Sequence, residues 1–235
     1  MKTIVAILVI FFYNTQPLKY ENKLAPDYMQ GIKYLKKNRK TFNRILKGDS
    51  EKRAIIISVV FPEIVRYSSI KDLFETKSLE IGYVSRGAEF IDYSVGRFQM
   101  KPSFVESIEF SVRTSEILSD KYPDIIAYKN NNKKARRKER INRMKSLNWQ
   151  LRYMMAFYDI VSQKHPFLKE QSLHYCVRFF AVAYNHGFYA KKSELENWMD
   201  QKTYPYGPGV SGQQYAYSKI SEYFYTKHYP KIFNY

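Results

Sequence analysis

The chain has 235 residues, of which 45% are hydrophobic and 17% aromatic, and its formal net charge is +17. This length and apolar content are typical of a globular protein with one sizeable core, and they exclude an intrinsically disordered chain. The charge favours an acidic partner such as nucleic acid, anionic lipid or an acidic polymer. The single cysteine, Cys176, excludes an intrachain disulfide framework and a cysteine-based zinc cluster, and its apolar neighbours predict a buried, inert thiol.

The N-terminus has the pattern of a secretory leader. Lys2 supplies a positive charge, residues 3–13 are apolar, and polar residues follow as far as Pro17. The apolar run is shorter than the roughly 20 residues that span a bilayer. We therefore expect residues 1–17 to be a signal peptide or an N-terminal anchor, and residues 18–235 to form one domain exported to the periplasm or cell envelope. The poor cleavage pattern leaves open whether the leader is removed, kept as an anchor or packed into the core.

Helical patterns follow the leader. Residues 25–48 form an amphipathic pattern that closes at Gly48. Residues 53–68 are apolar on all sides and therefore buried, either as a helix or as a strand, and Pro62 predicts a kink or an end there.

The second half of the chain is also predicted to be helical. Ser103 and Glu106 form an S-x-x-E capping box, which predicts a helix over residues 104–118, and Ser193 with Glu196 forms another. The remaining predictions are an exposed connection at 123–140, helices at 149–160 and 173–184, a loop at 203–212 and a Tyr-rich helix at 213–225. The sum is a mainly α protein.

Metal and nucleophile chemistry find little support in the sequence. The histidines have no metal-binding spacing, and no nucleophile elbow or phosphate-binding loop is present. We therefore predict no metal site and no cofactor. The four histidines are His165, His174, His186 and His228.

The most concentrated positive charge is the run Lys133–Lys145. Such a run is most often a solvated helix or loop face, and less often a nucleic-acid-binding patch.

Glu63 is the unusual carboxylate of the sequence. It follows the apolar segment AIIISVVFP, and a carboxyl group in an apolar pocket has a raised pKa because desolvation disfavours the anion. A raised pKa suits a general acid that protonates a leaving oxygen near neutral pH. The alternative is an ordinary salt bridge with Arg66, three residues further along a helix.

Three separated motifs resemble those of the lysozyme superfamily, in particular the soluble lytic transglycosylase group. The segment SVGRFQMKPS is similar to the family segment S-x-x-G-A-x-G-L-M-Q-I-M-P-S-T, with matches at Ser94, Gly96, Gln99, Met100, Pro102 and Ser103. Upstream, Glu63 stands where the family carries its catalytic Glu, near the end of a buried helix. Downstream, residues 183–187 read AYNHG, similar to the family segment A-Y-N-x-G.

The resemblance implies a lysozyme-like domain with a cleft between a small lobe that bears the Glu and a helical lobe. It implies that Glu63 is the general acid and then the base at the β-1,4 bond between N-acetylmuramic acid and N-acetylglucosamine. Substrate-binding roles are implied for Ser94, Gly96, Gln99, Met100, Tyr184 and Asn185. Gly96 would let the sugar approach the backbone, Gln99 would hydrogen-bond the substrate or hold Glu63, and the Tyr184 hydroxyl and Asn185 would face Glu63.

Two departures from the family pattern leave the reaction open. Ile64 stands where the family has a Ser that orients the carboxylate, and Arg97 replaces an aliphatic residue. The interval before Ser94 also contains carboxylates that could activate water, so plain hydrolysis stands beside anhydro-forming transglycosylation. These carboxylates are Glu75, Glu80, Glu89 and Asp92, and turn capping is the simpler role for Asp92.

The leading hypothesis is an exported enzyme that cleaves peptidoglycan, whose peptide carboxylates would attract a basic protein. The alternatives are a lysozyme-like protein that binds wall glycan or an assembly partner without cleavage, and a nucleic-acid binder. We expect peptidoglycan strands as the partner and no nucleic acid, with association to the membrane or envelope through the N-terminus. The sequence leaves the oligomeric state and the physiological role open.

Overall fold

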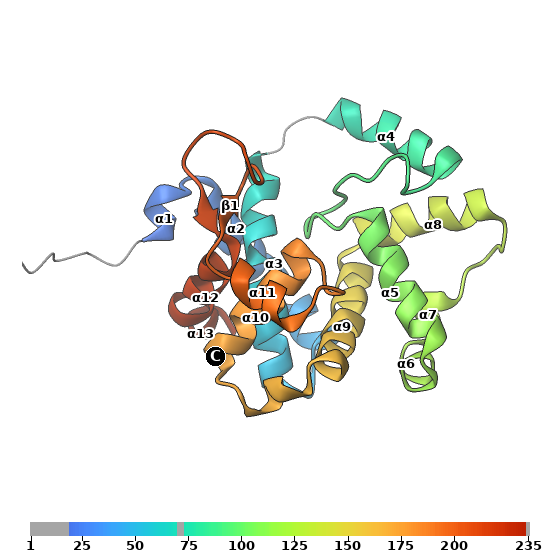
Figure 1. Cartoon of the computed structure of the whole chain (residues 1–235). Coiled ribbons are helices and arrows are strands. Elements are labelled where there is room, and N and C mark those ends of the chain that lie inside the picture. The colour runs from blue at the N-terminus through green and yellow to red at the C-terminus, as the bar shows by residue number, and fades with distance from the viewer. Residues whose placement is uncertain (1–18, 70–72, 234–235) are drawn as a thin grey trace, which may run out of the picture.

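The structure is a computed structural model that describes residues 19–69 and 73–233, and it is mainly helical (Figure 1). The predicted leader at residues 1–17 lies outside the described residues, as do the side chains of residues 68–76. In chain order the helices are α1 (Tyr20–Lys23), α2 (Asp27–Ile45), α3 (Ser50–Ser69), α4 (Leu73–Arg86), α5 (Pro102–Thr114), α6 (Glu116–Lys121), α7 (Pro123–Ile126), α8 (Lys133–Lys145), α9 (Leu147–Lys164), a 3₁₀ helix (Pro166–Glu170), α10 (Leu173–His186), α11 (Lys192–Trp198), α12 (Tyr217–Lys227) and α13 (Tyr229–Phe233).

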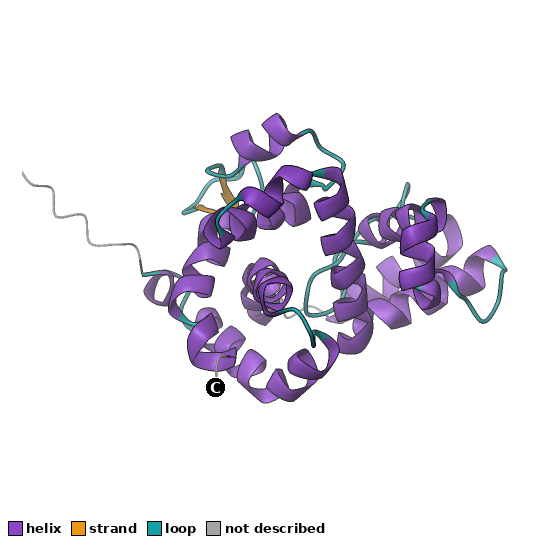
Figure 2. Ribbon diagram, turned by 90° about the horizontal axis from the view of Figure 1, so that it is seen from below, coloured by secondary structure: helices purple, strands orange, loops and turns teal. Residues whose placement is uncertain are grey.

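Helix α3 forms the centre of the larger group of helices. It packs against α2, α10 and α12, and it runs through the middle of the ring of helices seen end-on in Figure 2. Residues 54–61 are all buried, which explains why the segment is apolar on every side. The question of helix or strand that the sequence left open is therefore answered by a helix surrounded by other helices.

Pro62 does not end α3, contrary to one of the two outcomes expected from the sequence. The helix continues to Ser69 although proline lacks the N–H that would bond the preceding turn. Two buried tyrosines support the helix at this point. The hydroxyl of Tyr204 donates to the carbonyl of Pro62 at 2.8 Å, and that of Tyr217 donates to the carbonyl of Val59 at 2.9 Å.

A smaller group of helices, α4 to α8, lies to one side of the ring (Figure 1). Helices α5 and α8 connect it to the larger group by packing against α9. Glu63 belongs to α3, the central helix of the larger group, so the expectation that a small lobe carries the Glu is wrong.

The basic run is a helix with buried arginines rather than part of an exposed connection. Residues 123–126 and 133–145 form α7 and α8, and the side chains of Arg140 and Arg143 are buried in contact with carboxylates. Part of the charge in this run therefore holds the fold together.

Both predicted capping boxes are wrong. Helix α5 begins at Pro102, and the carboxylate that caps it is that of Asp92, which accepts from the N–H and the hydroxyl of Ser103. Glu106 instead bonds Tyr83 and Arg140.

The capping box at Ser193 fails in a similar way. Helix α11 begins at Lys192, its N-cap Lys191 makes no side-chain cap bond, and Glu196 accepts from Tyr175 and Lys192. In both cases the serine lies inside the first turn of the helix and not at the N-cap, where a capping box requires it.

The C-terminal region contains a short hairpin. Strands β1 (Lys202–Tyr204) and β2 (Tyr215–Ala216) pair antiparallel, and residues 205–214 form the loop between them. The loop predicted at 203–212 is confirmed in part, but the two strands were not predicted, and the helix expected from residue 213 begins at Tyr217. None of the helices within the described ranges is long and apolar enough to cross a membrane.

Candidate active site

Glu63 lies in the last third of α3, and its side chain is almost completely removed from water. The residue is 5% exposed, and its Oε2 atom is buried without a hydrogen-bond partner. Burial raises the pKa of the carboxyl group from 4.5 to about 7, against the opposing effect of the nearby cations Arg66 and Lys101. Glu63 is therefore protonated in a large fraction of molecules near neutral pH, as a general acid requires.

Arg66 forms the salt bridge that was the alternative explanation for Glu63, but the contact is long. Its Nη1 atom lies 3.8 Å from Oε2 of Glu63, which is too long for a hydrogen bond. The Arg66 side chain is 39% exposed, whereas the Glu63 side chain is buried. The ion pair therefore offsets only part of the cost of burial, and the pKa of Glu63 stays raised.

The segment that resembles the family motif forms a tight turn facing this carboxyl group. Val95 and Met100 pair across the turn with N–H···O distances of 2.8 and 3.1 Å. Gln99 has φ of +50°, which is unusual for a residue with a side chain, and its Nε2 donates to the carbonyl of Gly96 at 2.9 Å. The Gln99 amide thus stabilises the turn itself, and the structure shows no bond from it to Glu63.

The structure requires glycine at position 96, but not for the approach of a sugar that the resemblance implies. Its φ is +71°, and a Cβ atom at this position would lie less than 3.0 Å from both Nε2 of Gln150 and the carbonyl oxygen of Met144. Gly96 is therefore needed because α8 and α9 approach the turn from behind, and it does not line the pocket beside Glu63.

Arg97 is not among the residues that line the pocket of Glu63. Its guanidinium lies over the rings of Tyr34 on α2 and Tyr67 on α3, at 4.8 and 4.2 Å from the ring centroids. Such cation–π contacts stabilise the position of a loop. The arginine that departs from the family pattern therefore fastens the turn to α2 and α3.

Tyr184 and Asn185 approach from α10, on the other side of the turn. The Tyr184 hydroxyl donates to the carbonyl of Phe98 at 2.5 Å, so its proton holds the turn and is not donated to Glu63. Burial, and to a smaller extent the charge of Glu63, raise the pKa of Tyr184. The predicted proximity to Glu63 is found, but the direct hydroxyl contact is not.

Glu63, residues of the turn and residues of α10 line one pocket of about 110 Å³. Six predicted site residues line it, and among the predicted residues only Gly96 is absent from its wall. The lining residues are Glu63, Arg66, Ser94, Gln99, Met100, Lys101, Phe104, Tyr184 and Asn185. Sequence reasoning assigned no site role to Arg66, Lys101 or Phe104, although Lys101 lies inside the motif and Arg66 was considered as a salt-bridge partner.

Two larger hollows share lining residues with the pocket. One hollow, of about 480 Å³, shares Lys101, Phe104, Tyr184 and Asn185 with it and extends to Tyr189. The other, of about 450 Å³, shares Arg66 and extends to Tyr204 and Tyr206. An extended ligand at Glu63 could therefore make contacts in either hollow.

The additional carboxylates do not join Glu63 in this pocket. Asp92 caps α5 and lines the adjoining hollow of about 480 Å³, Glu80 pairs with Lys145, and Glu89 is exposed in another hollow that does not include Glu63. The side chain of Glu75 lies outside the described residues. Glu63 is thus the one carboxylate among the described residues that line the pocket.

The remaining candidate groups are metal ligands and the single cysteine. Within the part of the chain that the structure describes, no three His, Cys, Asp or Glu side chains are grouped so that they could hold a metal ion. Cys176 is buried as predicted, with its thiol 3.4 Å from the carbonyl of Leu168, and burial raises the pKa of that thiol.

Comparisons with known proteins give no match. No protein family matches the chain, and neither the curated proteins nor the solved structures include one that is significantly similar.

Proposed function

We propose that this protein is a glycosidase of the lysozyme superfamily, similar to the soluble lytic transglycosylases, that cleaves the β-1,4 bond between N-acetylmuramic acid and N-acetylglucosamine in peptidoglycan. The observation that carries the proposal is the buried Glu63 carboxyl group, whose free Oε2 adjoins a pocket lined by residues of all three motifs. Motifs at residues 63, 94–103 and 183–187 are far apart in the chain. Their meeting at one carboxyl group is unexpected if the sequence similarity is accidental.

The chemistry follows from the protonation state of Glu63. The protonated carboxyl group donates its proton to the glycosidic oxygen as the bond from that oxygen to C1 of the muramic sugar breaks. The N-acetylglucosamine unit leaves with that proton as its 4-hydroxyl group. The positive charge that develops at C1 is stabilised by the acetamido group of the substrate itself, a recognised exception to the use of two carboxylates.

The second half of the reaction returns the proton. The Glu63 carboxylate accepts a proton from the muramic 6-hydroxyl, whose oxygen bonds to C1 and closes a 1,6-anhydro ring. The absence of a second carboxylate among the described pocket-lining residues supports this route over activation of water. Hydrolysis would instead add water at C1 and give a reducing end.

Ile64 favours a second candidate, a lysozyme-like protein that binds wall glycan or an assembly partner without cleavage. Ile64 is fully buried and supplies no hydroxyl group to orient the neighbouring carboxyl. We include in the proposal that the protein is exported to the periplasm or envelope, where the predicted leader would direct it and peptidoglycan would be present.

Digestion of peptidoglycan sacculi tests the proposal. Wild-type protein should release muropeptides with 1,6-anhydro ends, and Glu63→Gln, which keeps the shape but cannot donate a proton, should lower the rate by at least ~100-fold. Glu89→Gln is the matched control, because Glu89 is exposed and outside the pocket, and it should retain full activity.

The products and binding distinguish the alternatives. Reducing ends would indicate a hydrolase, and binding of sacculi without release of fragments would indicate the silent binder. Equal activity of the wild type and Glu63→Gln would rule out the mechanism.

A further inference from the structure

Two cations line the pocket of the buried carboxyl group. Arg66 follows Glu63 by one turn of α3, and Lys101 immediately precedes α5. Both line the pocket of Glu63, and each also lines one of the adjoining hollows, Arg66 with Tyr206 and Lys101 with Tyr189. A ligand that extends from Glu63 into either hollow would therefore meet a positive charge.

Neither cation is fully engaged within the protein. Arg66 lies 3.8 Å from Glu63 and Lys101 lies 3.8 Å from Asp92, and their side chains are 39% and 57% exposed. By contrast, the buried Arg140 contacts Glu106 and Glu109 at 2.8 and 2.6 Å. Arg66 and Lys101 thus retain hydrogen-bond donors that can reach a ligand in the hollows.

We propose that Arg66 and Lys101 bind carboxylate groups of the substrate on the two sides of the scissile bond, so that the site selects an anionic glycan over a neutral one. This inference rests on the proposed function, since it assigns the substrate class of the same site. A guanidinium group matches a carboxylate in a two-pronged contact, and an ammonium group attracts one as a point charge. Neutral sugars with acetamido and hydroxyl groups offer neither cation such a partner.

The electrostatics around Glu63 agree with this placement. Arg66 and Lys101 are the two groups whose charge lowers the pKa of Glu63, so both cations lie close enough to interact with its carboxyl group. The carboxyl group also interacts with the hydroxyls of three buried tyrosines, Tyr184, Tyr204 and Tyr217. Substrate carboxylates bound to the cations would offset their charge and favour the protonated form of Glu63. Selection of the substrate and retention of the catalytic proton would then depend on the same two residues.

The test measures binding in a Glu63→Gln background, so that no cleavage interferes. The two ligands are native sacculi and sacculi whose carboxylates have been converted to amides, which differ in charge but not in sugar sequence. We expect about tenfold tighter binding of the native form, the size expected for two partly exposed charge pairs. Arg66→Gln/Lys101→Gln should abolish this preference, and Arg66→Lys should retain part of it.

The matched control is Lys36→Gln/Lys40→Gln, which removes the same charge from the exposed face of α2, outside the pocket. It should keep the preference for native sacculi. If instead both double variants behave alike, the overall charge and not the pocket selects the ligand, and the inference is wrong. Thermal unfolding of each variant verifies that it is folded.

The outcomes separate this inference from the proposed function. Cleavage by the wild type with no preference for carboxylates would overturn the inference and leave the function standing. A preference that depends on Arg66 and Lys101, without cleavage by the wild type, would overturn the glycosidase and leave an anionic-glycan-binding site.

Discussion

The buried carboxyl group of Glu63 makes the stability of the protein depend on pH. At pH values well below 4.5 the group is protonated in both the folded and the unfolded state, whereas between 4.5 and about 7 only the unfolded state ionises. The folded state then binds more protons, so the free energy of unfolding falls as the pH rises. Above about pH 7 the loss reaches about 3 kcal/mol.

We therefore expect Glu63→Gln to match the wild type in stability near pH 4 and to exceed it by about 3 kcal/mol near pH 8. The variant keeps the side-chain shape but never ionises. Urea unfolding at a series of pH values measures the difference, with Glu89→Gln as an exposed control. A difference that stays constant with pH would mean that Glu63 titrates normally.

Gly96 provides a second test at the scale of single residues. Gly96→Ala would strain a backbone at φ +71° and force a methyl group against Gln150 and Met144, so we expect a loss of about 2–5 kcal/mol. Gly48 also has a positive φ, of +98°, but nothing lies within 4 Å of its Cβ position. Gly48→Ala should therefore cost only the strain, about 1–2 kcal/mol. Equal losses in urea unfolding would show that Gly96 is not closely packed.

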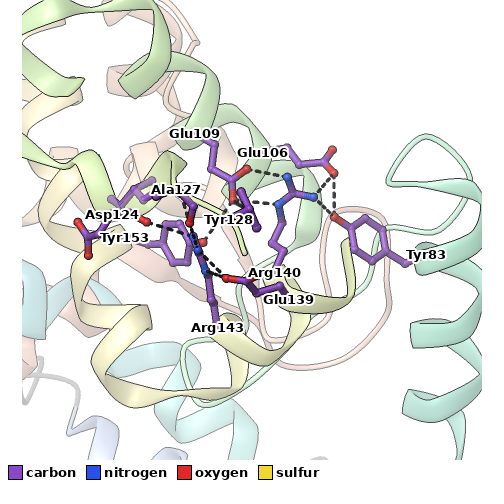
Figure 3. A network of polar contacts seen from close by, with 11 residues as sticks. Tyr83, Glu106, Glu109, Asp124, Ala127, Tyr128, Glu139, Arg140, Arg143 and Tyr153 are labelled. Carbon is purple, nitrogen blue, oxygen red and sulfur yellow. Dashed lines mark hydrogen bonds and ion pairs between the residues drawn. The ribbon is translucent and has the colours of Figure 1, made fainter. Parts of the chain in front are cut away.

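Among the elements, α4, α5 and α8 are joined by a buried polar network (Figure 3). Arg140 of α8 lies at its centre and bonds Glu106 and Glu109 of α5 together with the Tyr83 hydroxyl of α4. Tyr128 and Tyr153 also donate to Glu109. Because α5 begins beside Lys101, this network fixes the helix that carries one wall of the pocket.

Removing one partner of the buried ion pair between Arg140 and Glu109 should lower the free energy of unfolding. We expect Arg140→Met to lower the free energy of unfolding by about 3–5 kcal/mol, because it leaves the buried Glu109 carboxylate without its cation. Glu109→Leu should cost somewhat less, because Arg140 keeps its ion pair with the partly exposed Glu106. The double variant should lose clearly less than the sum. Urea unfolding of the four proteins forms a double-mutant cycle, and additive losses would contradict a direct coupling.

The ion pair of Lys145 with Glu80 is the matched comparison for this cycle. It also joins α8 to α4, but the Lys145 side chain is 48% exposed. Lys145→Met should therefore cost less than about 1 kcal/mol.

For the whole molecule, the net charge of +17 should govern its approach to peptidoglycan. One group of exposed cations lies on α2, whose solvent-facing side carries Lys33, Lys36, Lys37, Lys40 and Arg44, and Lys47 follows just beyond its end. Attraction between exposed charges decreases with salt, since the screening length falls from about 10 Å at 0.1 M to about 3 Å at 1 M. We expect binding of native sacculi to weaken at least ~10-fold over this range.

Neutral chito-oligosaccharides supply the control for this prediction. Their binding should change little between 0.1 and 1 M salt, on the order of twofold or less, because they carry no charge to screen. The same salt dependence for both ligands would mean that salt acts on the protein and not on the attraction.

The amino-acid pattern was sufficient for the features that depend on neighbours along the chain. The apolar segment before Glu63 predicted a buried element and a carboxyl group with a raised pKa, because burial on all sides follows from local composition. The amphipathic patterns predicted α2, α9, α10 and α12, since a helix buries one face at a fixed period. The residues around Gln99, Tyr184 and Glu63 were expected together, and they line one pocket.

Contacts between distant segments decided the rest. Gly96 is glycine because Gln150 of α9 lies against it, Arg97 is held by Tyr34 and Tyr67, and Tyr184 bonds the turn instead of Glu63. No period or spacing in a single sequence indicates which side chain will face another across the core. The same reason explains why the run at 133–145 looked fully solvated, although two of its arginines are buried: their carboxylate partners become visible only when the helices pack.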